Sequence, residues 1–494
     1  MTSFSVPSVA GSIAEPGAFA PVVEDLGRGA DVESLFLRLA QLPHCLFLDS
    51  ALRNRGLGRY SFVTADPFEF SRFSVEEGDA LVWLAGTMRR FPAARAPGLP
   101  PFQGGAAGLL GYDLGRQLER VPAPRFDEFQ TPALAIGLYD VVVAVDHLED
   151  RAWIISQGFP ELEHSRRRRR AEERLAAFRR QLETPAAATT ATPATLAAAT
   201  GDRSAAVLTP DDLAPQYIVD GPKGLTSSFS RSQYLDAAAR AIDYIHAGDI
   251  FQVNLAQRLL FPAEDNAVDL YRRLRRRNPA TFAGYFDTGP FQILSASPER
   301  FLQARRGQVE ARPIKGTRRR SRQPEADLFG GSELLASEKD RAENVMIVDL
   351  LRNDLSRVCR ADSVRVTDLC RLENYQFVQH LVSVVRGELR DELTPADLLR
   401  AAFPGGSITG APKVRAMEII AELEPTARGP YCGSLGYLGF DGAMDFNILI
   451  RTITAGKGWL QAPVGGGIVA QSSPEAEYEE TWDKAEGLLR AMQQ

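Results

Sequence analysis

A tract of small and turn-forming residues interrupts this chain of 494 residues. From Thr184 to Asp202 the sequence reads TPAAATTATPATLAAATGD, which offers few large side chains to bury. Such a composition is typical of a linker or surface loop rather than of a packed element. We therefore expect a first region over residues 1–184, a linker over 185–225 and a second region over 226–494.

Short apolar segments on both sides of this tract predict a mixed α and β protein. Strands are predicted where β-branched and aromatic residues lie between turn residues, at 60–64, 108–112, 133–145, 153–156, 251–260 and 291–295. Helices are predicted where apolar residues recur at helical spacing, at 161–182, 233–247, 267–277, 338–352 and 475–492. We find no internal repeat at a solenoid period.

The charge balance argues against a polyanionic partner. The formal net charge of -6 gives no global reason to expect nucleic-acid binding. Arg166–Arg170 is a run of five arginines, but acidic residues surround it. We interpret it as a solvated helix face, and we expect small-molecule and protein partners.

The cysteines and the N-terminal segment indicate a cytoplasmic protein. Four cysteines are scattered without zinc-site or disulfide-framework spacing: Cys45, Cys359, Cys370 and Cys432. The N-terminus lacks a basic start followed by an apolar core, and no run of about 18 apolar residues occurs. We therefore expect a chain that neither spans a membrane nor leaves the cytoplasm.

Two acidic pairs lie on predicted helices. The pairs are Asp340 with Glu343 and Glu477 with Glu480. Three residues separate the members of each pair, so each pair shares one helix face. Four carboxylates on two faces could hold a hard cation. Lys339 and Lys484 stand beside them, and surface ion pairing explains the pattern as well.

Two glycine-rich segments, 404–413 and 464–469, indicate tight backbone turns. The first leads into a predicted helix, where backbone N–H groups suit a carboxylate or phosphate. It lacks the register of a nucleotide-binding P-loop. Tight turns alone are the alternative explanation.

Lys315 stands between Ile314 and Gly316, just before the basic run Arg318–Arg320. A lysine that is crowded by cations or desolvated has a lowered pKa and becomes an amine nucleophile. A surface lysine in a basic loop is the alternative. Glu299, in the segment SPER, is a candidate acid or base partner. No cysteine lies in a G-x-C-x-G turn, so any nitrogen taken from glutamine is liberated by another protein.

In their order along the chain, the motifs resemble those of the chorismate-utilising enzymes, which include component I of anthranilate synthase and of aminodeoxychorismate synthase, isochorismate synthase and salicylate synthase. The matching segments are LFLDS (46–50), GLGRYSF (56–62), GGAAGLLGYD (104–113), AGDIFQVNLAQR (247–258), SASPER (295–300), PIKGTR (313–318), ENVMIVDLLRND (343–354), QHLVS (379–383), FPGGSITGAPK (403–413), NILIRT (447–452), GGGIV and EAEYEETWDKA. They cover nearly the whole chain.

This resemblance implies an α+β fold with two large antiparallel sheets packed together and surrounded by helices. Both regions of the chain contribute to it. It also implies Mg²⁺ as cofactor, with Glu343 and Glu480 as direct ligands and Asp340 and Glu477 nearby. Asp340 departs from the glutamate usual in the family. Two carboxylates and the ring carboxylate of chorismate suit the octahedral shell of magnesium.

The resemblance further implies a chorismate site in the second region. Positions that hold chorismate in the family correspond to Gly316, Thr317, Ser407, Tyr437, Arg451, Gly466 and Lys484. Arg451 offers a planar fork for the enolpyruvyl carboxylate. His380 corresponds to a histidine next to the reacting ring, although a lone histidine is often only a core residue.

Two positions sort the family by chemistry. Members that add water carry a lysine base where this chain has Gln252, so we expect no water activation. Anthranilate synthases resemble one another in the segment PIAGT, whereas aminodeoxychorismate synthases have PIKGT, as here with Lys315. The resemblance implies attack by that lysine on ring C2, with Glu299 as general acid, and then addition of ammonia at C4. The expected product is 4-amino-4-deoxychorismate, the precursor of 4-aminobenzoate and folate.

The same resemblance implies two partners and leaves two alternatives. A glutamine amidotransferase subunit is expected to deliver the ammonia. LFLDS resembles an element that forms a tryptophan pocket in relatives, with Ser50 at its serine, although a plain core strand fits equally. Anthranilate synthase component I remains an alternative function. A catalytically silent subunit that docks an amidotransferase is another.

Overall fold

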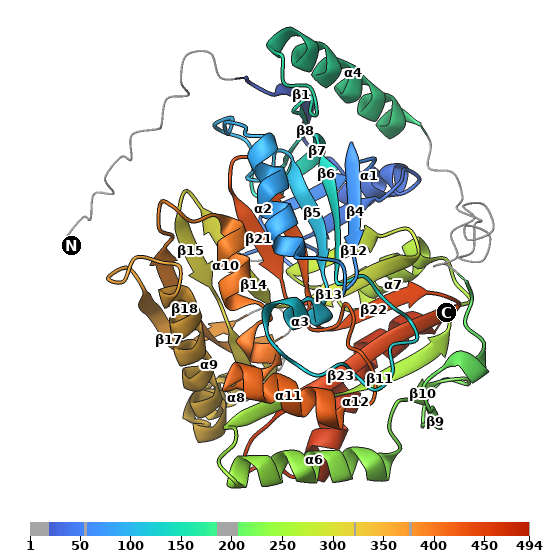
Figure 1. The fold of residues 1–494 in the computed structure, drawn as a ribbon, viewed down its shortest axis with the longest axis vertical. Helices are drawn as coiled ribbons and strands as arrows, with labels where there is room; N and C mark the ends of the chain where they lie inside the picture. Colours follow the sequence, from blue (N-terminus) through green and yellow to red (C-terminus); the bar gives the residue numbers. More distant parts are fainter. Residues whose placement is uncertain (1–18, 54–56, 185–205, 321–322, 375–377, 494) are drawn as a thin grey trace.

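The computed structural model describes residues 19–53, 57–184, 206–320, 323–374 and 378–493. Most of the predicted linker, residues 185–205, lies outside this part. Two antiparallel sheets form the centre of the molecule, and helices cover their outer faces (Figure 1). This architecture confirms the predicted fold class.

The first sheet has thirteen strands within the described part of the chain. Its strand order is β1 (Val22–Gly27), β8 (Arg151–Ser156), β7 (Val141–Asp146), β3 (Tyr60–Thr64), β2 (Leu46–Asp49), β12 (Phe282–Asp287), β13 (Phe291–Ser297), β22 (Thr452–Gly456), β23 (Trp459–Ile468), β11 (Gln252–Pro262), β10 (Thr226–Ser227) and β9 (Tyr217–Ile218), with β19 (Gly410–Ala411) also paired to β11.

The second sheet has ten strands among the residues described. Its order is β16 (Ile314–Arg319), β18 (Val378–Glu388), β15 (Gln308–Ala311), β14 (Arg300–Arg305), β21 (Met444–Asn447), β20 (Ser434–Gly439), β5 (Gly105–Leu110), β6 (Leu134–Tyr139) and β4 (Glu69–Phe73), with β17 (Arg365–Asn374) also paired to β18. Both regions of the chain supply strands to both sheets. In the first sheet, β2 pairs with β12 across the boundary between the regions.

Apolar side chains from the inner faces of the two sheets pack against each other. Leu46, Phe62 and Phe286 from the first sheet meet Leu109 and Tyr437 from the second in one buried cluster. The alternation of side chains along each strand places these residues between the sheets. The predicted linker also contributes described structure, because β9 pairs with β10 and the Trp459 indole donates to the carbonyl of Leu208 at 2.9 Å.

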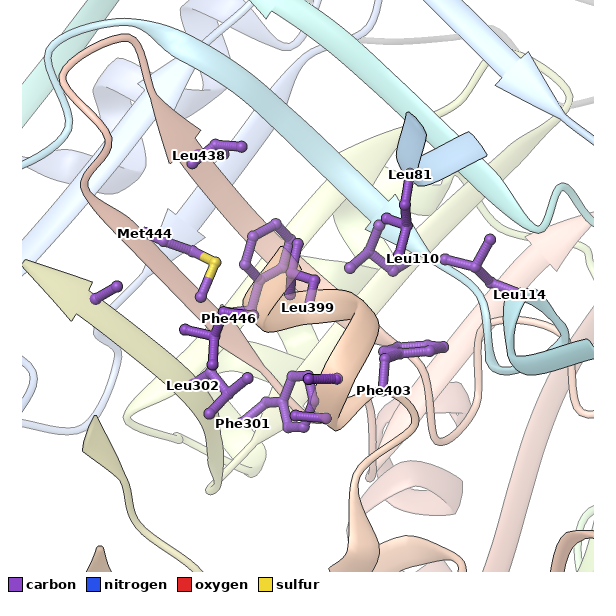
Figure 2. Packing of buried hydrophobic residues seen from close by; sticks show 14 of the residues in the cluster. Leu81, Leu110, Leu114, Phe301, Leu302, Leu399, Phe403, Leu438, Met444 and Phe446 are labelled. Atoms are coloured by element: carbon purple, nitrogen blue, oxygen red, sulfur yellow. The ribbon is translucent and has the colours of Figure 1, made fainter. Parts of the chain in front are cut away.

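Helices close the outer faces. On the first sheet lie α1 (Val32–Leu39), α4 (His164–Glu183), α7 (Ala267–Arg277) and α12 (Pro474–Met492), while α6 (Arg231–His246) and α11 (Lys413–Leu423) pack near β11. On the second sheet lie α2 (Ala80–Arg90), α8 (Pro324–Ala336), α9 (Glu338–Ser356) and α10 (Pro395–Ala402). Figure 2 shows part of this second outer core, where Leu81 from α2 lies beside Leu110, and where Leu399 from α10 belongs to the same cluster as Leu302 and Phe446.

The helices that carry the acidic pairs begin at well-defined caps. The Ser337 side chain accepts from the backbone N–H of Asp340 at the start of α9. Ser473 caps α12 in the same way, and Pro474 is its first residue. Serine at the cap and proline in the first turn both favour helix initiation. The four carboxylates therefore lie in the first two turns of their helices.

The five-arginine run is only partly a solvated face. Arg166, Arg168 and Arg169 are exposed on α4, as predicted. Arg167 is buried, stacks on the ring of Phe159 at 3.7 Å and donates to the carbonyl of Gln157 at 2.8 Å. The helical period turns one arginine in the run toward the core, which the composition of the run could not show. No helix in the described ranges is long and apolar enough to cross a membrane.

Candidate active site

Lys315 lies on β16, where the pairing with β18 shifts register between Lys315 and Thr317. Its side chain is 13 % exposed, and Nζ donates to the carbonyl of Ser407 at 3.3 Å. The Nζ atom also lies 4.0 Å from Oε2 of Glu343. Lys315 is therefore not a surface lysine of a basic loop, and its amine faces the predicted site.

Gly316 is required beside it for two reasons. Its φ of +72° is a conformation that residues with a side chain rarely adopt. A Cβ there would also lie 2.7 Å from the Leu334 side chain and 3.0 Å from the Asp340 carboxylate. The predicted substrate residue Gly316 thus brings β16 close to the first turn of α9. The side chain of its neighbour Thr317 lies outside the described part of the structure.

Glu299 follows β13 and is 5 % exposed. Burial raises the pKa of its carboxyl to about 7, against the opposing effects of Lys315, a hydrogen bond from the Ser407 side chain, the Ile314 backbone and Arg451. Its Oε1 atom has no hydrogen-bond partner within the described part of the chain. A carboxyl that is partly protonated at neutral pH and has a free oxygen is suited to donate a proton.

Ser407 connects these two groups. It lies in the short 3-10 turn η4 (Gly406–Ile408), and its carbonyl contacts Lys315 while its hydroxyl contacts Glu299. The segment after this turn is anchored by Lys413, whose Nζ donates to Asp354 and to the Ala402 carbonyl, both at 2.7 Å. The glycine-rich segment 404–413 therefore holds a polar residue against the lysine and its acid partner.

Gln252 begins β11 and is fully buried. Neither its Oε1 nor its Nε2 has a hydrogen-bond partner among the residues that the structure describes. A Cβ on Gly467 would lie 2.4 Å from this Nε2 and 3.7 Å from Nζ of Lys315. A buried amide without partners costs stability, and such groups often mark a ligand site. From the sequence, Gln252 served only to distinguish family members that add water from those that do not. The structure places its side chain close to Lys315.

His380 and Arg451 interact with each other, and Arg451 also interacts with Glu299. Burial and then the charge of Arg451 lower the pKa of His380 to about 4, although a backbone hydrogen bond with Gly316 opposes the shift. The imidazole is therefore neutral at pH 7. Burial lowers the pKa of Arg451, and Glu299 opposes this. The Arg451 guanidinium makes no hydrogen bond or ion pair among the described residues, so it is available to a carboxylate.

The acidic pair of α12, Glu477 and Glu480, lies against Gly466 on β23. A Cβ there would lie 3.0 Å from Oε2 of Glu477, 3.4 Å from Oε1 of Glu480 and 3.6 Å from Nζ of Lys484. Lys484 donates to Glu480 at 2.6 Å and to the Gly465 carbonyl at 2.9 Å. Glycine at this position allows α12 to approach the strand so closely.

Charges from both helices act on one another. Burial raises the pKa of Glu343, with Asp340 and Glu477 adding to the rise and Lys315 and Lys339 opposing it. For Glu480, the effect of burial is outweighed by Lys484, Lys339 and Lys315, and the pKa is lowered. The two pairs therefore belong to one electrostatic cluster rather than to two separate solvated faces.

The donor set of this cluster fits a hard cation. Glu477 is 2 % exposed, and its Oε2 has no partner among the described residues. Its Oε1 accepts from Ser472 at 2.6 Å and lies 3.5 Å from Nζ of Lys339. As they stand, no three acidic, histidine or cysteine side chains of the described residues are arranged to hold a metal ion. Lysines take up the carboxylate charge instead.

Tyr437, which was predicted to hold chorismate, lies apart from these residues in the structure. Tyr437 lies on β20, stacks on Phe102 at a centroid distance of 4.4 Å and lines a different cavity of about 360 Å³ together with Ser50. The two-residue period of the strand directs it between the sheets. The sequence motif identified a tyrosine at this position, but it did not show toward which face of β20 the side chain points. The Ser50 hydroxyl donates to the Tyr60 carbonyl at 2.6 Å.

Ion pairs surround that cavity. Arg300 donates to Asp445 at 2.9 Å, and Arg386 lies 2.9 Å from Glu310. The hydroxyl of Tyr437 is an exception, because it has no partner among the residues described. Ser50 therefore lines a preformed cavity and is more than part of a plain core strand.

Known proteins have a similar architecture and a similar sequence. A family model described as chorismate binding enzyme matches residues 52–490. An anthranilate synthase component I from Streptococcus pneumoniae superposes with a TM-score of 0.72 at 30 % identity, over 89 % of this chain and 93 % of that one. The chain therefore belongs to the family of chorismate-binding enzymes.

Two curated relatives have similar identities but different functions. An aminodeoxychorismate synthase component 1 from Klebsiella aerogenes is 44 % identical over 475 residues, which cover 93 % of this chain and 96 % of the relative. An anthranilate synthase component 1 from Thermus thermophilus is 41 % identical over 477 residues, which cover 94 % and 96 %. Overall identity thus establishes an enzyme that acts on chorismate, and the choice of reaction depends on residues of the site.

Proposed function

We propose that this chain converts chorismate and ammonia to 4-amino-4-deoxychorismate, as aminodeoxychorismate synthase component I. The observation that carries this proposal is the placement of Lys315, whose buried amine faces the site beside Glu299. A nucleophile and a proton donor that face the same site are what the reaction requires.

The proposed reaction uses both groups in sequence. The Lys315 amine adds to ring C2 through its nitrogen lone pair, the ring double bonds shift, and the C4–O bond breaks as Glu299 protonates the leaving hydroxyl to give water. Ammonia then adds at C4 and loses a proton, while the C2–N bond to Lys315 breaks and the lysine is regenerated. The enolpyruvyl group stays on the ring.

The surrounding residues support this sequence by binding. Arg451, without a partner among the described residues, suits the enolpyruvyl carboxylate as a planar two-pronged donor. The imidazole of His380, which is neutral at pH 7 and interacts with the Gly316 backbone and with Arg451, would contact the ring of the substrate. Gln252 supplies an amide rather than a lysine base, which favours ammonia over activated water as the nucleophile.

Magnesium is part of the proposal. Glu343 and Glu480 would hold the ion directly, with Asp340 and Glu477 nearby, and oxygen ligands are those that Mg²⁺ prefers. When bound, the ion supplies positive charge that offsets the ring carboxylate of the substrate. The unpartnered Oε2 of buried Glu477 supports a cation at this place.

We further propose that a glutamine amidotransferase subunit delivers the ammonia. Cys45, Cys359, Cys370 and Cys432 are all buried, and burial raises the pKa of each thiol. A glutamine-hydrolysing cysteine needs the opposite, an accessible thiolate. The name component 1 that the relatives carry fits a second component.

The cavity beside Ser50 is proposed to bind tryptophan for a structural purpose. Its volume of about 360 Å³ and its lining, which combines aromatic and apolar side chains with charged ones, suit an amino acid with a large ring. Because Lys315 and Glu299 are not among its lining residues, we expect the bound molecule to support the packing of the two sheets rather than the chemistry.

The test incubates the pure chain with chorismate, magnesium and ammonium and identifies the product by mass, with and without a lyase that forms 4-aminobenzoate. We expect aminodeoxychorismate, which the lyase converts. Anthranilate as the main product would favour the alternative of anthranilate synthase component I. No turnover, even with a glutaminase partner, would favour a silent docking subunit, against which the intact Lys315 and Glu299 argue.

A further inference from the structure

One lysine of the carboxylate cluster differs from the others in how it is held. Lys339 lies in the first turn of α9, and its Nζ is 3.5 Å from Oε1 of Glu477 on α12. Its charge also interacts with Glu343 and Glu480. It thus interacts with carboxylates of both helices.

The other two lysines of the cluster are anchored to the backbone. Lys315 donates to the Ser407 carbonyl at 3.3 Å, and Lys484 donates to the Gly465 carbonyl at 2.9 Å. Among the described residues, the Lys339 ammonium makes one hydrogen-bonded ion pair, the long one to Glu477, and its side chain is 44 % exposed. Lys339 can therefore leave the cluster for water without leaving a carbonyl unpaired.

The Glu477 carboxylate would stay in place if Lys339 moved away. Oε1 keeps a 2.6 Å hydrogen bond from Ser472, which fixes the side chain independently of Lys339. Oε2 is buried and has no partner among the residues described. If Lys339 moves away, a carboxylate held on one side and free on the other remains beside Glu480 and Glu343.

We propose that Lys339 is an internal counter-cation that neutralises the carboxylate cluster when no metal is bound and competes with Mg²⁺ for it. This inference rests on the magnesium site of the proposed function. Mg²⁺ and the Lys339 ammonium are both cations, so a metal ion bound among these carboxylates repels Lys339 and favours its withdrawal into water. The lysine keeps the acidic helices together in the empty enzyme, and it lowers the affinity for the metal.

The test is the affinity for Mg²⁺, measured by titration calorimetry and by the Mg²⁺-dependent rise of Tm in low salt, without chorismate. Lys339→Gln removes the charge and keeps most of the length. We expect it to bind Mg²⁺ about tenfold more tightly, because a nearby like charge is removed. The difference should shrink at high ionic strength.

Two variants serve as matched controls. Arg341→Gln makes the same change of net charge on the same helix at an exposed position, and we expect it to change affinity by less than about twofold. Lys339→Arg keeps the charge and should stay near the wild-type value.

Equal or weaker Mg²⁺ binding by Lys339→Gln, relative to Arg341→Gln, would overturn the inference, and so would the absence of Mg²⁺ binding in all variants. The readout involves no turnover, so a different reaction product leaves this result unchanged. The two proposals can therefore fail separately.

Discussion

Around Lys315 and around Ser50, the molecule buries charged and polar groups in two different ways. In the cavity beside Ser50, Arg300 is paired with Asp445, and the neighbouring Asp49 is held by Arg275 at 2.6 Å. Around Lys315, an oxygen of Glu299 and both amide atoms of Gln252 have no partner within the described part of the chain. Paired groups fix the shape of a cavity, whereas unpaired groups cost stability and leave their bonding capacity for a ligand.

The difference separates groups that support packing from groups that support chemistry. Unpaired buried polar groups persist where a ligand compensates them. The hydroxyl of Tyr437 in the other cavity also has no partner among the described residues, and it lies apart from Lys315 and Glu299. The comparison therefore predicts that substitutions around Lys315 change turnover strongly, and that substitutions in the cavity beside Ser50 change it little.

The largest expected effect is that of Lys315→Ala. Removal of the proposed nucleophile should lower the rate of aminodeoxychorismate formation by about a thousandfold or more. Magnesium-dependent chorismate binding should remain. The measurement is product formation by mass, with chorismate binding followed by calorimetry. Lys223→Ala, at an exposed loop lysine, is the control, and turnover equal to wild type in Lys315→Ala would eliminate the covalent step.

Glu299→Gln should lower turnover by about a hundredfold, which is typical for loss of a general acid. Burial raises the Glu299 pKa to about 7, so the protonated form that donates is lost as the pH rises through 7. In the wild type, kcat/KM should therefore fall above this pH, and in the variant this fall should disappear. His380, with a pKa of about 4, stays neutral across this range. A pH profile unchanged by the substitution would refute the assignment.

The same substitution should stabilise the fold at high pH. The pKa of Glu299 is raised in the folded state, so its contribution is most favourable below the ordinary value of 4.5 and is lost as the pH rises through about 7. At pH 8, Glu299→Gln should raise the free energy of unfolding by about 2 kcal/mol, and at pH 4.5 by little. Denaturant unfolding at the two pH values measures this. Asp445→Asn, which removes the ion pair with Arg300, should instead lower the free energy of unfolding at pH 8. If both substitutions changed this free energy in the same direction, the comparison between the two regions would be wrong.

The smallest effect is expected for Tyr437→Phe. Turnover and KM for chorismate should stay near wild type, because Tyr437 lies in the other cavity. Tryptophan affinity should fall by about fivefold, the value of one hydrogen bond. Calorimetry with tryptophan and steady-state kinetics test both parts. A large rise in KM for chorismate would restore Tyr437 to the substrate site, and no tryptophan binding by the wild type at millimolar concentration would remove the tryptophan proposal.

Sequence reasoning predicted the sheets, the acidic helices and the grouping of Lys315 with Glu299, because ordered motifs identify residue types in a known arrangement. It grouped Tyr437 with the chorismate residues, whereas the structure places Tyr437 in the other cavity, since the motif does not show which face of β20 the side chain takes. It also treated Arg167 as solvated, although only the position on the helix decides which arginine of the run is buried. The pairing of Lys339 with a carboxylate on another helix depends on a tertiary approach that no local pattern contains.

The order of strands in the first sheet also determines when this chain can fold. β22 and β23, formed by residues 452–468, lie between β13 and β11 in the middle of that sheet. During synthesis, the first sheet cannot be completed until these residues have been made, because among the described strands β13 and β11 are connected only through β22 and β23. Contacts of such long range slow folding and leave sheet edges open to other chains. A chain halted before residue 452 would therefore be exposed to aggregation, and chaperones would act on it before the active site exists.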